Sequence, residues 1–393
     1  MQKKFIPVFR PQLPSAERLL PYLRQIDSTR FYSNHGPLVL EFEQRLASYL
    51  GLPRHGLVSA ASGTAALVGA ILASAGRAGR QRPLAILPAL TFVATAAAVE
   101  SCGYQPYLAD IDPDSWLLDA DRLTAHPELD RVGLVVPVAT FGRPVPQRAW
   151  QTFQQQSGIP VVIDGGASFE GASEAPHDFF GPIPVALSFH ATKSFATGEG
   201  GSTATTDIDL ARRTIQTLNF GFWDTRESRS PSINGKMSEY HAAVGLAELD
   251  GWSAKRGALL SVALCYQRLA KRFGIEHRFT TAPIISGCYV LFRCAGTEEK
   301  NRIKEALNRH GVDFRLWYGE GLHRQPYLAG VASESLNITN ALAPHLLGLP
   351  VAPDLTEMEI EHVVSVLAAE IETESAPEQA NHQRSLMLGD FLA

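Results

Sequence analysis

Short apolar runs alternate with longer, helix-like stretches through the first two thirds of the chain. The apolar runs predict buried strands over Leu84–Leu87, Val132–Val138, Ile159–Asp164 and Pro184–Phe189. The stretches between them suit helices, over Ala65–Ser74, Thr95–Cys102 and Gln147–Gln156. This alternation predicts an α/β domain built on a mostly parallel sheet.

The pattern changes after about residue 250, where helices and strands no longer alternate. Long and short helices and strand material follow one another, which predicts a smaller α+β domain. The expected elements are a helix over Trp252–Phe273, strand material over Ile275–Cys294, a helix over Glu298–His310 and a strand over Val312–Trp317.

A helix-start signal stands near the end of the chain. Thr356 and Glu359 have the spacing of a capping box, so we expect a final helix from there to Ala368. The tail after it is rich in Glu, Gln and Ser and is expected to be loosely ordered until Leu386. We therefore divide the chain into a large domain over residues 1–250, a small domain over 251–372 and a tail over 373–393.

Composition and charge narrow the class of protein. The 393 residues are 45% hydrophobic and 19% charged, which allows a sizeable core. The net charge of -5 and the absence of a block of Lys and Arg argue against nucleic acid as the main partner. No apolar run is long enough to span a membrane. The four cysteines have neither zinc-site nor disulfide spacing, so a cytoplasmic protein without a bound metal fits best.

Lys193 stands between an apolar strand and the glycine-rich turn Gly198–Gly201. A lysine chosen blindly is a solvated surface charge. Held on a rigid element, however, its amine becomes a nucleophile toward a carbonyl cofactor. We interpret Lys193 as the Schiff-base lysine of a pyridoxal phosphate enzyme.

Three other groups could bind such a cofactor. Ser62, Gly63 and Thr64 precede an Ala-rich helix, whose first N–H groups and positive dipole end suit a phosphate. Asp164 ends a parallel strand, and Phe92 could stack on a flat ring. Each signal alone more often marks a helix N-cap, a turn cap or a core aromatic.

Together, these residues are similar in order and spacing to fold type I pyridoxal phosphate enzymes. More closely, the chain resembles the DegT/StrS family of sugar aminotransferases. The motifs that carry the resemblance are Phe31–Leu38, Ser62–Leu67, Asp110–Asp112, Ser188–Lys193, Gly198–Gly201, Asn234–Glu239 and Leu347–Pro350. The resemblance implies an α/β fold with a mostly parallel, seven-stranded sheet between helices, followed by a smaller α+β domain.

The resemblance also implies a role for each cofactor residue. Lys193 would form the Schiff base and move the proton during transamination, Asp164 would pair with the pyridine nitrogen, and Phe92 would stack on the ring. Asn234 would complete the phosphate site of the neighbouring subunit, which implies a homodimer with shared active sites. The phosphate itself would be held by Ser62, Gly63, Thr64 and Ser188.

The substrate implied by the resemblance is a keto sugar, expected to be a nucleotide-linked keto-deoxysugar from antibiotic or polysaccharide biosynthesis. Glutamate would be the amino donor, and the mechanism would be ping-pong. Substrate contacts are expected from Phe31, Tyr32, Ser33, Asn34, Arg315, Trp317, Tyr318 and His323.

The chain departs from the family pattern after Asp164. The family usually has a Gln or His near the cofactor's phenolic oxygen, whereas Ala167 stands here with no polar side chain. This leaves a cyclitol aminotransferase or a sugar dehydratase as alternatives. A non-catalytic, cofactor-binding regulatory protein is a third, which the retained Lys193 disfavours. His190 is expected on the face of an extended strand opposite Lys193 and therefore in a structural role.

Overall fold

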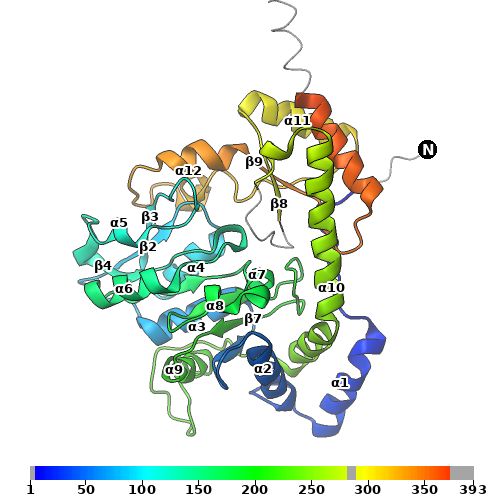
Figure 1. The fold of residues 1–393 in the computed structure, drawn as a ribbon. Helices are drawn as coiled ribbons and strands as arrows, with labels where there is room; N and C mark the ends of the chain where they lie inside the picture. The colour runs from blue at the N-terminus through cyan, green and yellow to red at the C-terminus, as the bar shows by residue number, and fades with distance from the viewer. Residues whose placement is uncertain (1–4, 281–288, 372–393) are drawn as a thin grey trace, which may run out of the picture.

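A seven-stranded sheet forms the centre of the large part of the molecule (Figure 1). The computed structural model describes residues 5–280 and 289–371. The strands are β1 (Leu57–Ala60), β2 (Leu84–Pro88), β3 (Gln105–Ala109), β4 (Val132–Val135), β5 (Ile163–Asp164), β6 (Val185–Ser188) and β7 (Gly201–Ala204).

Two hydrogen-bonded ladders make up this sheet, in the orders β1-β7-β6-β5 and β3-β2-β4. Parallel bridges from Val135 to Val161 and from Val138 to Asp164 join them. The full order is therefore β3-β2-β4-β5-β6-β7-β1. Only β7 runs in the direction opposite to the other strands of this sheet. The expected mostly parallel sheet is therefore confirmed.

Helices pack around the sheet. One of them, α3, contacts β6 and β7 and has an almost wholly apolar sequence. The helices of this part are α1 (Ala16–Thr29), α2 (Pro37–Tyr49), α3 (Gly63–Ser74), α4 (Val93–Ser101), α5 (Ala120–Leu123), α6 (Gln147–Ser157), α7 (Phe169–Glu174), α8 (Pro176–Phe179) and α9 (Ile208–Leu218).

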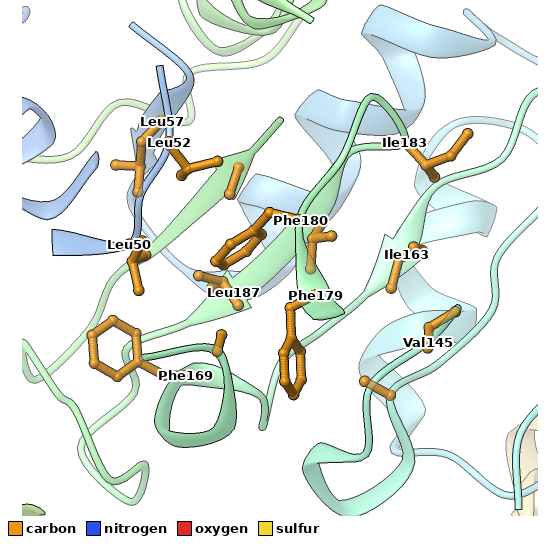
Figure 2. Close-up of a cluster of buried hydrophobic side chains, with 14 of the residues drawn as sticks. Leu50, Leu52, Leu57, Val145, Ile163, Phe169, Phe179, Phe180, Ile183 and Leu187 are labelled. Atoms are coloured by element: carbon orange, nitrogen blue, oxygen red, sulfur yellow. The ribbon is translucent and has the colours of Figure 1, made fainter. Parts of the chain in front are cut away.

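A large apolar core lies on one side of the sheet. Figure 2 shows Phe169, Phe179 and Phe180 from the α7–α8 region close to Ile163 and Leu187 of the sheet. All five side chains are buried. Burying such side chains contributes roughly 1.5–3 kcal/mol each, which anchors the strands that end at the site described below.

One long helix, α10 (Glu239–Arg272), connects the large part to the C-terminal part (Figure 1). It begins well before the expected Trp252, because Ser238 accepts a hydrogen bond from His241 N and caps it. The expected domain boundary after residue 250 thus falls inside a continuous helix. The other elements are β8 (Val290–Arg293), α11 (Thr297–Arg309), α12 (Asn337–Leu342), β9 (Leu346–Leu349) and a helix over residues 357–371.

Residues near the N-terminus pack with the C-terminal part. Ile6 bridges to Val312 and Phe9 bridges to Val351, both in parallel. The Arg10 guanidinium also lies 2.7 Å from Glu359 Oε1. These contacts attach the segment around Phe9 to the C-terminal part.

The C-terminal expectations have mixed outcomes. The capping box is confirmed, since Thr356 N donates to Glu359 Oε2 at 3.0 Å and Glu359 N donates to Thr356 Oγ1 at 3.3 Å. The expected strand Val312–Trp317 is wrong: only Val312 and Arg315 form bridges, each to a different segment. The expected tail lies outside the described residues. No described helix is both long and apolar enough to cross a bilayer.

Glu43 of α2 generates a prediction about stability. Its carboxylate accepts hydrogen bonds from Ser59 N and Oγ at 2.8 and 2.7 Å, and burial raises the pKa of Glu43 from 4.5 to about 7. Because the folded state favours the protonated acid, the contribution of Glu43 to folding stability is complete below pH 4.5. That contribution is lost as the pH rises through 7. Glu43→Gln should therefore raise the unfolding free energy by about 2 kcal/mol at pH 8.

Urea denaturation at pH 5 and pH 8 checks this expectation. The gain should be small at pH 5, where most of the folded protein already carries the neutral acid. Glu298→Gln, at an exposed glutamate in the first turn of α11, is the matched control. An equal gain at both pH values would contradict the assignment.

Candidate active site

A cavity of about 450 Å³ opens at the carboxyl ends of the central strands. Asp164 ends β5 and Ser188 ends β6, and both line it, as does Lys193. The N-terminus of α3 closes one side, and residues of the C-terminal part close another. In an α/β sheet, this edge is where ligands bind.

Lys193 lies in a tight turn after β6. Its backbone N–H donates to His190 O at 2.8 Å, and Ala191 N donates to Gly198 O at 2.8 Å. Phe189 and Phe195 flank the turn, are fully buried, and pack edge to face with ring centroids 5.3 Å apart. The backbone of the turn is therefore fixed in the core while the lysine side chain lines the cavity.

The same turn corrects the expectation for His190. The strand ends at Ser188, so His190 and Lys193 are not on opposite faces of one extended segment. Both side chains line the cavity. His190 Nδ1 lies 2.9 Å from Thr192 Oγ1, and His190 Nε2 lies 3.8 Å from Glu199 Oε1.

Asp164 is held by two hydrogen bonds. Thr95 Oγ1 donates to Oδ2 at 2.7 Å, and Gly166 N donates to Oδ1 at 3.0 Å. Thr91 Oγ1 lies 2.9 Å from Thr95 Oγ1 and extends the network. A carboxylate oxygen can accept more than one hydrogen bond, so Asp164 can still take a cationic N–H from a ligand in the cavity.

The start of α3 forms an anion cradle. Ser62 Oγ accepts from Ala65 N at 3.1 Å, which is the N-cap role. The N–H groups of Gly63 and Thr64 belong to the first helical turn, which has no intrahelical acceptors. A Cβ added to Gly63 would lie 2.7 Å from Ser188 Cβ and 2.9 Å from Ser188 Oγ. Glycine therefore lets Ser188 approach the start of α3 closely, so that the Ser188 hydroxyl and the free N–H groups lie side by side, an arrangement that suits a small anion such as phosphate.

Phe92 and Ala167 also line the cavity. Phe92 is 55% exposed at the start of α4, with its ring centroid 6.3 Å from that of Tyr318. Ala167 belongs to an apolar cluster with Phe141 and Tyr289. Ala167, where the family usually has a polar side chain, is thus part of a largely apolar wall.

The structure brings ten of the sequence-predicted residues to this cavity: Ser62, Gly63, Thr64, Phe92, Asp164, Ala167, Ser188, Lys193, Trp317 and Tyr318. The other predicted residues do not line the cavity of their own chain. Among the described residues, those away from the cavity wall are Phe31, Tyr32, Ser33, Asn34, Asn234, Arg315 and His323.

Most of these distant residues have partners elsewhere. Asn234 Oδ1 accepts from Lys236 Nζ at 2.8 Å, and Arg315 Nη1 lies 2.8 Å from Asp313 Oδ1. His323 Nε2 lies 2.9 Å from Asn340 Oδ1. The ring of Tyr32 stacks on that of Tyr240, with ring centroids 6.3 Å apart.

Several residues that line the cavity or support its lining were not predicted from the sequence. Tyr289 lies nearest the chemistry, because Lys193 Nζ donates to its hydroxyl at 3.3 Å. Thr95 supports Asp164, and Phe9 packs on Trp317 with centroids 5.5 Å apart. Thr95 stands in the expected helix after Phe92, where its hydroxyl was the available signal. Tyr289 and Phe9 carry no local signal, because only tertiary packing brings them to Lys193.

The cavity combines a lysine after β6, a supported carboxylate at the end of the neighbouring strand β5 and the N-terminus of α3. This combination defines a transferase of the fold type I class. The family can be stated as well. The chain belongs to the DegT/DnrJ/EryC1/StrS aminotransferase family, whose model matches residues 15–368. The expected family and the expected aminotransferase activity are thereby confirmed.

Individual relatives agree with this assignment. The chain is 32% identical to Protein Rv3402c of Mycobacterium tuberculosis (strain ATCC 25618 / H37Rv), over 92% of this chain and 89% of that one. It is 27% identical to dTDP-4-amino-4,6-dideoxy-D-glucose transaminase of Escherichia coli, over 93% and 99%. The crystal structure of DesI in the presence of its TDP-sugar product superposes with a TM-score of 0.81, at 28% identity, covering 98% of this chain and 96% of DesI.

The anion cradle generates a second prediction. Gly63→Ala should weaken binding of pyridoxal phosphate by at least about tenfold, because the new methyl group would push Ser188 away from the start of α3. Equilibrium dialysis of the apoenzyme, read by cofactor absorbance, measures the dissociation constant. Gly257→Ala is the control, since a Cβ there meets nothing within 4 Å. Unchanged binding in Gly63→Ala would rule out the cradle as the phosphate site.

Proposed function

We propose that this aminotransferase uses pyridoxal phosphate to move an amino group from glutamate onto a nucleotide-linked keto-deoxysugar, by a ping-pong mechanism. The observation that carries the proposal is the shared cavity of Lys193, Asp164 and the start of α3. It offers an amine, a carboxylate and an anion cradle to one ligand. Pyridoxal phosphate has an aldehyde, a basic ring nitrogen and a phosphate to match them.

The residues of the cavity fit this cofactor. The N–H groups of Gly63 and Thr64 and the hydroxyl of Ser188 would hold the phosphate, with Ser62 fixing the helix start. Asp164, already supported by Thr95, would accept the hydrogen bond of a protonated ring nitrogen. When bound, the cofactor supplies an electron sink that stabilises negative charge at the reacting carbon.

Lys193 would bind the cofactor and then move the proton. Its amine would take the proton from Cα of the amino donor and deliver it to the carbon that bore the aldehyde. Water would then release the donor as a keto acid while its amino group stays on the cofactor, and the same steps would run in reverse on the keto sugar. The fixed backbone of the turn keeps the amine within range of both carbons.

A sugar is the acceptor that the cavity wall and the relatives support best. Trp317 and Tyr318 line the cavity, and aromatic faces pack well against the apolar faces of sugar rings. The names of the Escherichia coli transaminase and of the DesI structure refer to nucleotide-linked sugars. Ala167 adds an apolar surface, which suits a deoxygenated sugar better than a charged one.

We further propose a homodimer in which each subunit completes the other's site. The segment from Phe31 to Asn34 lies beside two later segments, because Glu239 N donates to Tyr32 O, and Asn34 lines a surface hollow with Phe220 and Trp223. Phe31, Tyr32 and Tyr240 are about half exposed there. Exposed aromatic side chains in a group are typical of protein interfaces.

The proposed chemistry is checked by absorbance. The purified enzyme should have a band near that of protein-bound pyridoxal phosphate, and glutamate should replace it with a band at shorter wavelength. Lys193→Ala should lower turnover with a panel of nucleotide-linked keto sugars by at least about a thousandfold. A colourless enzyme, or full turnover by Lys193→Ala, would refute the proposed function.

Mixing two inactive variants tests the shared site. If Asn234 serves the partner's cofactor, a Lys193→Ala subunit paired with an Asn234→Ala subunit has one intact site. Random exchange then restores about a quarter of wild-type activity, since half of the dimers are mixed and one site in each is complete. If Asn234 acts in its own chain, mixing restores nothing.

A further inference from the structure

The amine of Lys193 has a specific partner within the cavity. Lys193 Nζ donates to the hydroxyl of Tyr289 at 3.3 Å, and the same nitrogen lies 5.6 Å from the centre of the tyrosine ring. Tyr289 comes from the C-terminal part, just before β8, whereas Lys193 follows β6 of the large part. This hydrogen bond therefore joins the two parts of the molecule at the reacting atom.

Tyr289 is itself held in one position. Only 8% of its surface is exposed. Its ring packs edge to face with Phe141, at a centroid distance of 5.4 Å, and with Trp317, at 5.3 Å. Aromatic pairs in this arrangement stabilise each other beyond the area they bury. The hydroxyl is thus presented to Lys193 by a rigid ring.

A second tyrosine supports the first. Tyr318 hydrogen-bonds to Tyr289, and its ring stacks on Phe141 with centroids 4.9 Å apart and planes within 3°. Burial raises the pKa of Tyr318 well above its ordinary value. Its hydroxyl therefore keeps its proton at neutral pH and remains available to the Tyr289 oxygen.

We infer that Tyr289 is a positioning residue for Lys193, fixing the amine on the path between the two carbons that exchange a proton. This inference rests on the proposed function. A free lysine side chain has four rotatable bonds, and restricting them costs conformational entropy. A hydrogen bond to a fixed acceptor offsets part of that cost before the proton moves. Tyr289 contacts the Lys193 amine, so its effect on proton transfer passes through Lys193.

Tyr289→Phe tests the inference, because it removes the hydroxyl and keeps the ring. We expect kcat to fall about 10- to 100-fold while KM for donor and sugar stays within about twofold. The isotope effect on kcat with glutamate deuterated at Cα should rise, since proton transfer becomes slower than the other steps. The dissociation constant of pyridoxal phosphate, measured by dialysis of the apoenzyme, should stay within about twofold.

Two controls separate the possible outcomes. Tyr327→Phe removes a hydroxyl from a tyrosine that is 81% exposed and should match the wild type. Tyr318→Phe should show a smaller loss than Tyr289→Phe, because it acts at one remove from the amine. A wild-type kcat and isotope effect in Tyr289→Phe, or a loss confined to cofactor binding, would overturn the inference.

The proposed function can fail independently of this inference. If glutamate leaves the absorbance of the wild-type enzyme unchanged, or Lys193→Ala keeps full turnover, the proposed function fails first. If the wild type reacts with glutamate, Lys193→Ala does not, and Tyr289→Phe behaves as the wild type, only the role of Tyr289 is wrong.

Discussion

The fixed turn that carries Lys193 is the constraint on which the site depends. Phe189 and Phe195 are buried on either side of it, and both pack against Phe169. Trp252 of α10 packs edge to face with Phe195, at a centroid distance of 5.6 Å. The turn is thereby tied to the core and to the long helix together. Holding the backbone of Lys193 in place keeps its amine within reach of both carbons between which the proton would move.

The C-terminal part closes the cavity in addition to extending the fold. Tyr289, Trp317 and Tyr318 form an aromatic wall opposite the strand ends, and Phe9 joins them from the N-terminal segment. Residues far apart in the chain thus surround Lys193. The wall limits the access of water, which strengthens the hydrogen bonds and charges that act inside the cavity.

The stretch after Asp164 shows how packing decides a local sequence. A Cβ at Gly165 would lie 2.6 Å from Val185 Cγ1, and one at Gly166 would lie 3.1 Å from Asp164 Oδ1. Glycine at both positions lets the chain pass close to β6 while Gly166 N supports the carboxylate. Ala167 then faces the aromatic wall. Ala167 shares its apolar cluster with Tyr289, whose hydroxyl accepts a hydrogen bond from Lys193.

The sequence by itself predicted the strands β2, β4, β5 and β6, with Asp164 at the end of one and Lys193 just after another, and the helix start at Gly63, because each depends on contacts between near neighbours in the chain. It could not determine that the run Val312–Trp317 bends instead of pairing, or that His190 and Lys193 share a cavity. Only the tertiary structure placed Tyr289 on the amine and left Asn234 away from it. Such contacts join segments that local periodicity does not relate, so packing between distant parts of the chain decides them.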